Sequence, residues 1–201
     1  MITRMQSKTL RGTMTTGSEP RLSLLEKAML RWVVVDPDDK LLDANIGSGK
    51  MAEYLRRNMQ CEICGVSDNM EHVRYARSLL RSSDIVYAAA GDIPWREDAF
   101  DTVLMKLGCE DEELLARMFA EAQRVLKPGG QLILGLRSQL PSVLMGEDAS
   151  GERRSVRKET VLRLLEKQRY HDLFWQRTGI TNGVVIAWKP KPEVDQVRKA
   201  I

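Results

Sequence analysis

The sequence lacks several features that would point directly to a function. It has only two histidines and three cysteines, and no apolar run approaches the roughly 20 residues that a membrane-spanning helix needs. Neither sign of charge dominates, since 31 Lys and Arg residues stand against 28 Asp and Glu residues in 201. The net charge of +3 argues against a general nucleic-acid binder. The few cysteines and the lack of a secretory leader lead us to expect a cytoplasmic protein with no membrane partner.

Two of the cysteines, Cys61 and Cys64, form a Cys-x-x-Cys pair of the kind that can mark a zinc site. Here the pair falls in a predicted strand, where residues three apart face opposite sides of the sheet. No second pair follows, so we expect no metal site and place both thiols in the core. Cys109 and the histidines His72 and His171 have no acid or base at a suggestive spacing. The sequence therefore identifies no catalytic residue.

Short apolar runs alternate with amphipathic segments from residue 40 onward, which predicts an α/β fold. The predicted strands cover residues 40–44, 61–66, 85–89, 101–107, 131–136, 171–176 and 183–188. The predicted helices cover residues 22–32, 50–58, 69–80, 111–126 and 158–168. The turn signal Thr181-Asn182-Gly183 joins the last two strands as a hairpin. We therefore expect a mixed, mostly parallel seven-stranded sheet with helices on both faces and an antiparallel strand near the C-terminal edge.

A single domain is expected over residues 21–190, because a chain of this length can bury one good core. Residues 1–20 are rich in Thr, Ser, Gly and basic side chains and are expected to be a flexible N-terminal tail. Residues 191–201 are expected to be a C-terminal tail. The polar stretch 138–156 follows the fifth predicted strand and contains Gly146 and Gly151. We expect it to be a mobile cover over a ligand site.

The most informative local pattern ends the first predicted strand and reads Asp43-Ala44-Asn45-Ile46-Gly47-Ser48-Gly49. Gly47 and Gly49 would let a ligand approach the backbone and would tolerate positive φ. The helix that follows offers free N–H groups at the edge of the sheet where open α/β folds bind ligands. The spacing is neither that of a dinucleotide-binding Gly-x-Gly-x-x-Gly nor that of a P-loop. Taken alone, the pattern fits an ordinary tight turn equally well.

Five further segments follow this turn in a characteristic order. They read Gly65-Val66-Ser67-Asp68-Asn69, Tyr75-Ala76-Arg77, Gly91-Asp92-Ile93-Pro94-Trp95, Ala99-Phe100-Asp101-Thr102-Val103 and Arg124-Val125-Leu126-Lys127-Pro128-Gly129-Gly130. Together, residues 40–136 resemble the class I S-adenosylmethionine (SAM) dependent methyltransferases, especially the ubiquinone/menaquinone-methyltransferase-like group that acts on small molecules. The resemblance implies a Rossmann-like fold with SAM as cofactor. It covers about half of the chain and is more specific for fold than for chemistry.

The resemblance implies cofactor roles for the residues of the first turn. Asp43 corresponds to the acidic residue that orients the glycine loop and often faces the amino group of SAM. Gly47 and Gly49 correspond to the second and third glycines of the family pattern. Asn45 stands in place of the first glycine. Asn tolerates left-handed backbone conformations, so the turn can survive, with an amide that crowds the ligand or adds a hydrogen bond to it.

The resemblance also implies roles beyond the first turn. Ser67 stands where the family has an acidic residue that binds the ribose hydroxyls, and Asp68 is its neighbour. Asp92 corresponds to the residue that accepts from the adenine amino group, and Ile93 would offer its backbone N–H to the ring. Lys106, near the end of the fourth predicted strand, is a further candidate for contact with the cofactor or a substrate.

These residues favour SAM-dependent methyl transfer to a small-molecule acceptor. The departures at Asn45 and Ser67 leave an alternative open, in which a methyltransferase-like fold has lost catalysis and serves as a ligand-binding or interaction protein. Methylation of nucleic acids ranks lower, because the Asn/Asp-Pro-Pro-Tyr/Phe segment of amino-group methylases does not follow the fourth predicted strand. The acceptor and the oligomeric state are not defined by the sequence.

Overall fold

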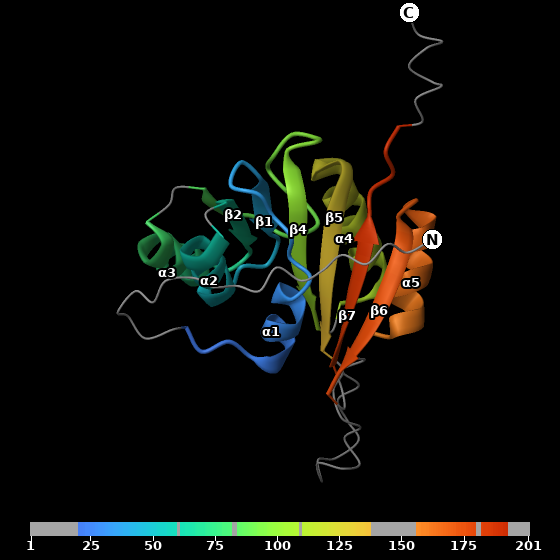
Figure 1. Cartoon of the computed structure of the whole chain (residues 1–201), viewed down its shortest axis with the longest axis horizontal. Helices are drawn as coiled ribbons and strands as arrows, with labels where there is room; N and C mark the ends of the chain where they lie inside the picture. Colours follow the sequence, from blue (N-terminus) through green and yellow to red (C-terminus); the bar gives the residue numbers. More distant parts are fainter. Residues whose placement is uncertain are drawn as a thin grey trace, which may run out of the picture.

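A computed structural model describes residues 20–59, 61–81, 84–108, 110–137, 156–179 and 182–192. These residues form one seven-stranded sheet with helices packed against it (Figure 1). The strands are β1 (Lys40–Asp43), β2 (Glu62–Ser67), β3 (Ile85–Tyr87), β4 (Phe100–Leu107), β5 (Leu126–Arg137), β6 (His171–Thr178) and β7 (Asn182–Trp188). The helices are α1 (Leu24–Leu30), α2 (Lys50–Met59), α3 (Met70–Leu80), α4 (Glu112–Val125) and α5 (Lys158–Lys167).

The strand order is β3-β2-β1-β4-β5-β7-β6. β1 pairs in parallel with β2 and β4, whereas β7 runs antiparallel to both β5 and β6. This confirms the predicted mixed sheet, with its antiparallel strand one place from the edge. The order of strands reverses between β1 and β4, and open α/β sheets place their ligand crevice at the carboxyl ends of strands at such a reversal.

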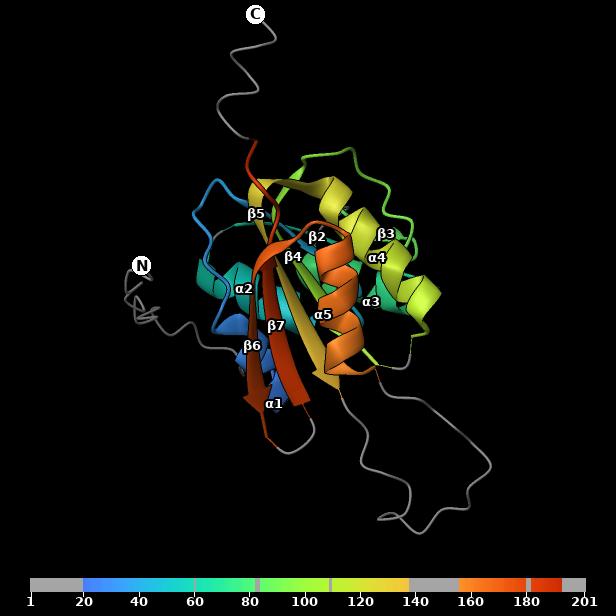
Figure 2. The same ribbon diagram turned by 90° about the vertical axis from the view of Figure 1, so that its right-hand side faces the viewer.

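Alternate side chains of the central strands enter two hydrophobic cores, one on each face of the sheet. On β4, Val103 and Met105 pack with α4 and α5, while Leu104 packs on the other face with α1, α2 and α3. Figure 2 shows α4 and α5 on one side of the sheet and α1 and α2 on the other. Cys64 belongs to the first core and Cys61 to the second, so the two thiols point to opposite faces as predicted.

The largest difference from the predicted elements concerns β5. The strand was predicted to begin at residue 131, but it begins at Leu126, so the segment Pro128-Gly129-Gly130, which is typical of a turn, is part of β5. The backbone of this segment is hydrogen-bonded to the residue that follows β7. Gly129 N–H donates to Lys189 O at 2.9 Å, and Lys189 N–H donates to Gly130 O at 3.0 Å. Gly129 has a φ of +80°, which absorbs the change of direction within the strand. A Pro-Gly-Gly sequence can therefore bend a strand without ending it.

Parts of the predicted domain organisation fall outside the described residues. These are residues 1–19 of the predicted N-terminal tail, residues 193–201 of the predicted C-terminal tail, and residues 138–155 of the predicted cover. Val156, at the end of that stretch, is described, and its N–H lies 3.4 Å from Gly108 O beyond β4. Across the described part of the chain, no helix is both long enough and apolar enough to span a bilayer.

Candidate functional site

The two glycines after β1 have different surroundings. Both have positive φ, +54° at Gly47 and +72° at Gly49. A Cβ at Gly47 would meet no atom within 4 Å, so the backbone there borders open space. A Cβ at Gly49 would lie 3.1 Å from the Cβ of Ala76 on α3. Gly49 therefore allows α2 to approach α3, whereas Gly47 leaves room that a ligand could fill.

Asp43, the last residue of β1, is fully buried. Its Oδ1 atom accepts a long hydrogen bond of 3.4 Å from Asn45 N–H, and its Oδ2 atom has no partner among the described residues. Burial raises the pKa of the Asp43 carboxyl, and the positive charge of Lys106 opposes this shift. Buried polar atoms in native proteins are nearly always bonded. The incomplete bonding of Asp43 is therefore consistent with a donor or cation supplied by a ligand.

The prediction that a left-handed backbone conformation explains the asparagine at position 45 is wrong. Asn45 is not among the described residues with positive φ, so no left-handed conformation is required there. Instead, its amide bridges β1 and β4: Oδ1 accepts from Lys106 N–H at 2.8 Å, and Nδ2 donates to Lys106 O. The asparagine thus fastens the end of β1 to β4, a role that glycine at this position has no side chain to perform.

The side chain of Lys106 extends from β4 toward the N-terminal helix. Its Nζ atom lies 3.4 Å from Oε1 of Glu26 on α1, and both side chains are partly buried. The pKa of Glu26 is lowered: burial alone would raise it, but the Ser23 backbone N–H and Lys106 outweigh that effect. Ser23 and Glu26 form a capping box at the start of α1. Glu26 was not among the candidate site residues, although the Ser-Leu-Leu-Glu pattern marks this cap in the sequence.

Ser67 lies at the end of β2, beside β1, and is buried. Its Oγ atom accepts from Asn69 N–H at 3.2 Å and lies 3.5 Å from Nδ1 of His72. Asn69 in turn caps α3 by accepting from the N–H groups of Glu71 and His72. Asp68 is exposed in the connection between β2 and α3. Ser67 therefore helps to shape this connection, and Asp68 is the accessible carboxylate.

The loop after β3 is held by α4. Ile93 N–H donates to Glu121 Oε2 at 2.9 Å, and Arg124 donates to the carbonyl oxygens of Ile93 and Trp95 at 2.9 and 2.8 Å. Arg124 also pairs with Glu121 and is the main cause of the lowered pKa of that carboxyl. Asp92 is exposed, while Ile93 packs in the core. The Ile93 N–H predicted to face adenine is thus already bonded within the protein.

The structure brings Asp43, Asn45 and Lys106 together at the adjoining ends of β1 and β4, with Gly47 directly after them. Ser67 and Asp68 follow at the end of the neighbouring strand β2. Asp92 and Ile93, in the loop after β3, are placed differently. Asp92 faces solvent, whereas Ile93 faces α4. Glu121 and Arg124, which hold that loop, were not predicted as site residues. No local pattern in the sequence indicates that they bond to Ile93 and Trp95.

Comparison with known proteins gives a consistent result. Residues 42–134 match a protein family described as a methyltransferase domain. The ubiquinone/menaquinone biosynthesis C-methyltransferase UbiE of Cereibacter sphaeroides is 30% identical over 129 residues, which are 61% of this chain and 52% of that protein. This chain therefore spans about half the length of that relative.

Two solved structures share the fold at low sequence identity. A putative methyltransferase in complex with the Trm112 activator of Haloferax volcanii has a TM-score of 0.70 and 16% identity, over 85% of this chain and 90% of that one. The [4+2]-cyclase SpnF has a TM-score of 0.69 and 20% identity, over 84% of this chain and 80% of that one.

The strand order, the glycine turn and these matches confirm the predicted resemblance to the class I SAM-dependent methyltransferases. The cofactor of this class is S-adenosylmethionine. Within the class, the segment from β1 to β5 is similar in sequence to proteins such as the ubiquinone/menaquinone C-methyltransferase described above.

Proposed function

We propose that this protein binds SAM at the carboxyl ends of β1, β2 and β4 and transfers its methyl group to a small molecule. The observation that carries the proposal combines two features: Oδ2 of Asp43 is a buried carboxylate oxygen with no partner among the described residues, and the backbone at Gly47 borders open space. Both features lie in the turn that the methyltransferase match includes. Each is explained by a ligand with a cationic group at this place.

The chain offers complementary charges for the amino-acid end of the cofactor. Asp43 Oδ2 would accept a hydrogen bond from the ammonium group, which relieves the cost of burying an unpaired acceptor. Lys106 would contribute positive charge toward the carboxylate, since the contact of its Nζ with Glu26 is a long one of 3.4 Å. Gly47 would let the backbone meet the ligand closely, and Gly49 would keep α2 in position.

The remaining cofactor contacts are proposed from the family resemblance. Ser67 and Asp68 would serve the ribose hydroxyls, with Asp68 the stronger acceptor because it is an accessible carboxylate. Asp92 and Ile93 would serve adenine. For Ile93 this requires the Glu121 carboxylate to release the N–H that it now accepts.

The chemistry requires little of the protein beyond positioning. When bound, the cofactor supplies a methyl group on a sulfonium that is its own leaving group. The chain must hold the acceptor in line and exclude water, and alignment of this kind supplies a large part of a rate enhancement. A small-molecule acceptor is supported by the similarity to UbiE, whose name places it in ubiquinone and menaquinone biosynthesis.

Two observations support the alternative of a fold without methyl transfer. The Ile93 N–H is occupied, and a serine stands at the ribose position, so two of the usual cofactor contacts are altered. The cyclase SpnF shares the fold, so the fold alone does not define the chemistry. The test must therefore separate cofactor binding from methyl transfer.

Two glycines provide a matched test of binding. Gly47 and Gly179 both have positive φ, and both have open space where a Cβ would be, but Gly179 follows β6, in the hairpin that leads to β7. Alanine at either position should cost similar stability, about 1 kcal/mol. Calorimetric titration with S-adenosylhomocysteine should show at least tenfold weaker binding for Gly47→Ala and unchanged binding for Gly179→Ala. Equal affinities for the two variants would place the cofactor elsewhere.

Methyl transfer is tested separately with SAM that carries a labelled methyl group. The wild-type protein is incubated with this cofactor and a small-molecule extract, and labelled products are identified by mass spectrometry. The proposal expects at least one labelled product that Gly47→Ala forms much more slowly than Gly179→Ala. Tight cofactor binding with no labelled product from any extract would favour the alternative of a binding protein.

A further inference from the structure

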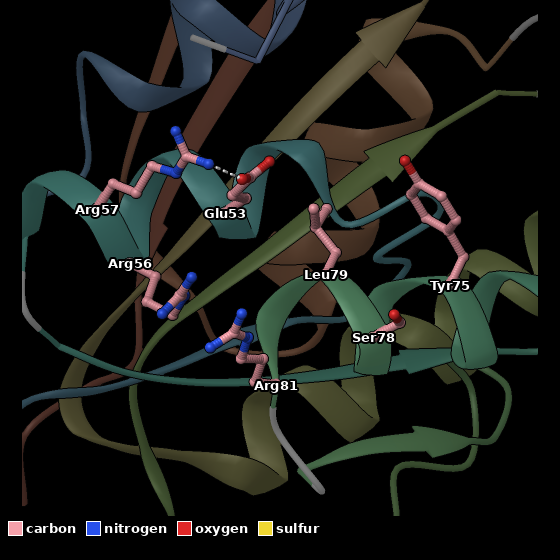
Figure 3. A pocket seen from close by; sticks show the side chains of 7 residues that line it. All are labelled: Glu53, Arg56, Arg57, Tyr75, Ser78, Leu79 and Arg81. Atoms are coloured by element: carbon pink, nitrogen blue, oxygen red, sulfur yellow. Dashed lines mark hydrogen bonds and ion pairs between the residues drawn. The ribbon is translucent and has the colours of Figure 1, made fainter. Parts of the chain in front are cut away.

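A pocket lies between α2 and α3. Its volume is about 430 Å³, and its lining residues are Glu53, Arg56, Arg57, Tyr75, Ser78, Leu79 and Arg81. Figure 3 shows the guanidinium groups of Arg56 and Arg81 pointing toward one another, with Ser78 on the side of the pocket nearer Tyr75. Pockets of this volume are in the range of small-molecule sites.

Arg56 and Arg81, two exposed arginines of this pocket, lie away from the proposed cofactor site. α2 begins directly after the glycine turn at the carboxyl end of β1, and Arg56 and Arg57 lie in its last turn. With a helical rise of about 1.5 Å per residue, Arg56 lies roughly 9 Å along the axis from the first residue of α2. Arg81 is the C-cap of α3, at the corresponding end of that helix. The two arginines therefore lie at the ends of α2 and α3 that point away from the glycine turn, whereas Glu53 and Leu79 extend the lining of the pocket toward Gly49.

The charges in the pocket are unbalanced. Arg57 pairs with Glu53, whose side chain is largely buried, so these two charges offset one another. Neither Arg56 nor Arg81 has a hydrogen-bond or ion-pair partner among the described residues, and both are exposed. Two guanidinium groups that face each other repel unless an anion lies between them. The pocket thus has two positive charges available to a ligand.

Helix dipoles account for part of this arrangement. Basic residues are favoured in the last turn of any helix, where the free carbonyl groups carry partial negative charge. That effect would place an arginine at the end of α2 or of α3 independently of the other helix. It does not explain why arginines from both helices line one pocket together with the Ser78 hydroxyl.

We propose that this pocket binds a small anion that carries a phosphate group. Guanidinium groups match phosphate oxygens in pairs, and arginine is the side chain best suited to such contacts. Arg56 and Arg81 would bind the phosphate from two sides. Tyr75 and Leu79 would contact the carbon part of the ligand. An extended nucleic acid fits less well, because it requires a basic stripe, and the net charge of the whole chain is only +3.

The test uses inorganic pyrophosphate and orthophosphate as probes, by calorimetric titration at low ionic strength. The double variant Arg56→Gln/Arg81→Gln removes both free charges, and Arg74→Gln is the control, an exposed arginine on α3 outside the pocket. Pyrophosphate should bind the wild type and the control alike. Each arginine removed from the pocket should weaken binding about tenfold. S-adenosylhomocysteine affinity should be the same in all these proteins, which separates this proposal from the proposed function.

Three results would overturn the proposal. The first is no pyrophosphate binding to the wild type at millimolar concentration. The second is binding that persists unchanged in the double variant, which would mean association elsewhere on the surface. The third is binding of single-stranded RNA that depends on both arginines while pyrophosphate does not bind. Both arginines are exposed, so the variants should fold, and a thermal melt of each one checks this.

Discussion

Asn45→Gly would restore the glycine that the family resemblance expects, and the structure predicts that this change destabilises the protein. The Asn45 amide makes two hydrogen bonds to the backbone of Lys106, one as acceptor and one as donor. Two such bonds at about 1 kcal/mol each, with about 0.5–1 kcal/mol for the added freedom of glycine in the unfolded chain, give a loss of about 2.5 kcal/mol. For a domain of this size the melting temperature should fall by roughly 5–10 °C.

Differential scanning calorimetry or urea unfolding measures this change. Asn58→Gly is a suitable control, because Asn58 makes a single exposed hydrogen bond, to Tyr54 O at 2.7 Å. Its loss should cost at most about half as much. The reasoning would be refuted if Asn45→Gly melted at the wild-type temperature or above it. In that case the amide bridge between β1 and β4 would contribute nothing, and the asparagine would need another explanation.

Further predictions concern three carboxylate positions. Burial raises the pKa of Asp43 above its usual 3.8, so this group should reduce folding stability progressively as the pH rises above that value. Asp43→Asn should therefore be more stable than wild type at neutral pH, by urea unfolding, yet bind S-adenosylhomocysteine at least tenfold more weakly. Ser67→Asp should tighten that binding several-fold, since a carboxylate accepts two hydrogen bonds from ribose; weaker binding in calorimetry would mean a different pocket. Because Arg124 lowers the pKa of Glu121, the stabilisation by this group should disappear as the pH falls through that lowered value, and Glu121→Gln should lack this pH dependence.

The sequence defined the sheet well because apolar periodicity reports burial directly. In a strand that is buried on both faces, successive apolar residues enter different cores, as Leu41 and Leu42 do. Short apolar runs in the sequence therefore predict such strands. The hairpin signal at Asn182-Gly183 correctly indicated the antiparallel strand. The start of β5 was missed because its pairing partner near Lys189 lies about 60 residues further along the chain, and no local pattern reveals such a contact.

The site was less predictable than the fold. The family pattern pointed to Asp43 and Gly47, but it could not show that one oxygen of Asp43 has no partner in the described part of the chain. The role of Asn45 depends on the backbone of Lys106, 61 residues away, and so could not be derived from the local turn. Likewise, Glu121 bonds to Ile93 across 28 residues, and only the packing of α4 beside the loop after β3 makes that contact visible.

The measurement that most directly tests the account compares two ligands of the wild-type protein. S-adenosylhomocysteine carries the amino-acid end that Asp43 and Lys106 are proposed to hold, whereas 5′-methylthioadenosine lacks it. Calorimetric titration should show saturable one-to-one binding of S-adenosylhomocysteine, and binding of 5′-methylthioadenosine that is at least tenfold weaker. Absence of binding by S-adenosylhomocysteine, or equal affinity for the two ligands, would contradict the proposal that the carboxyl ends of β1 and β4 hold the cofactor.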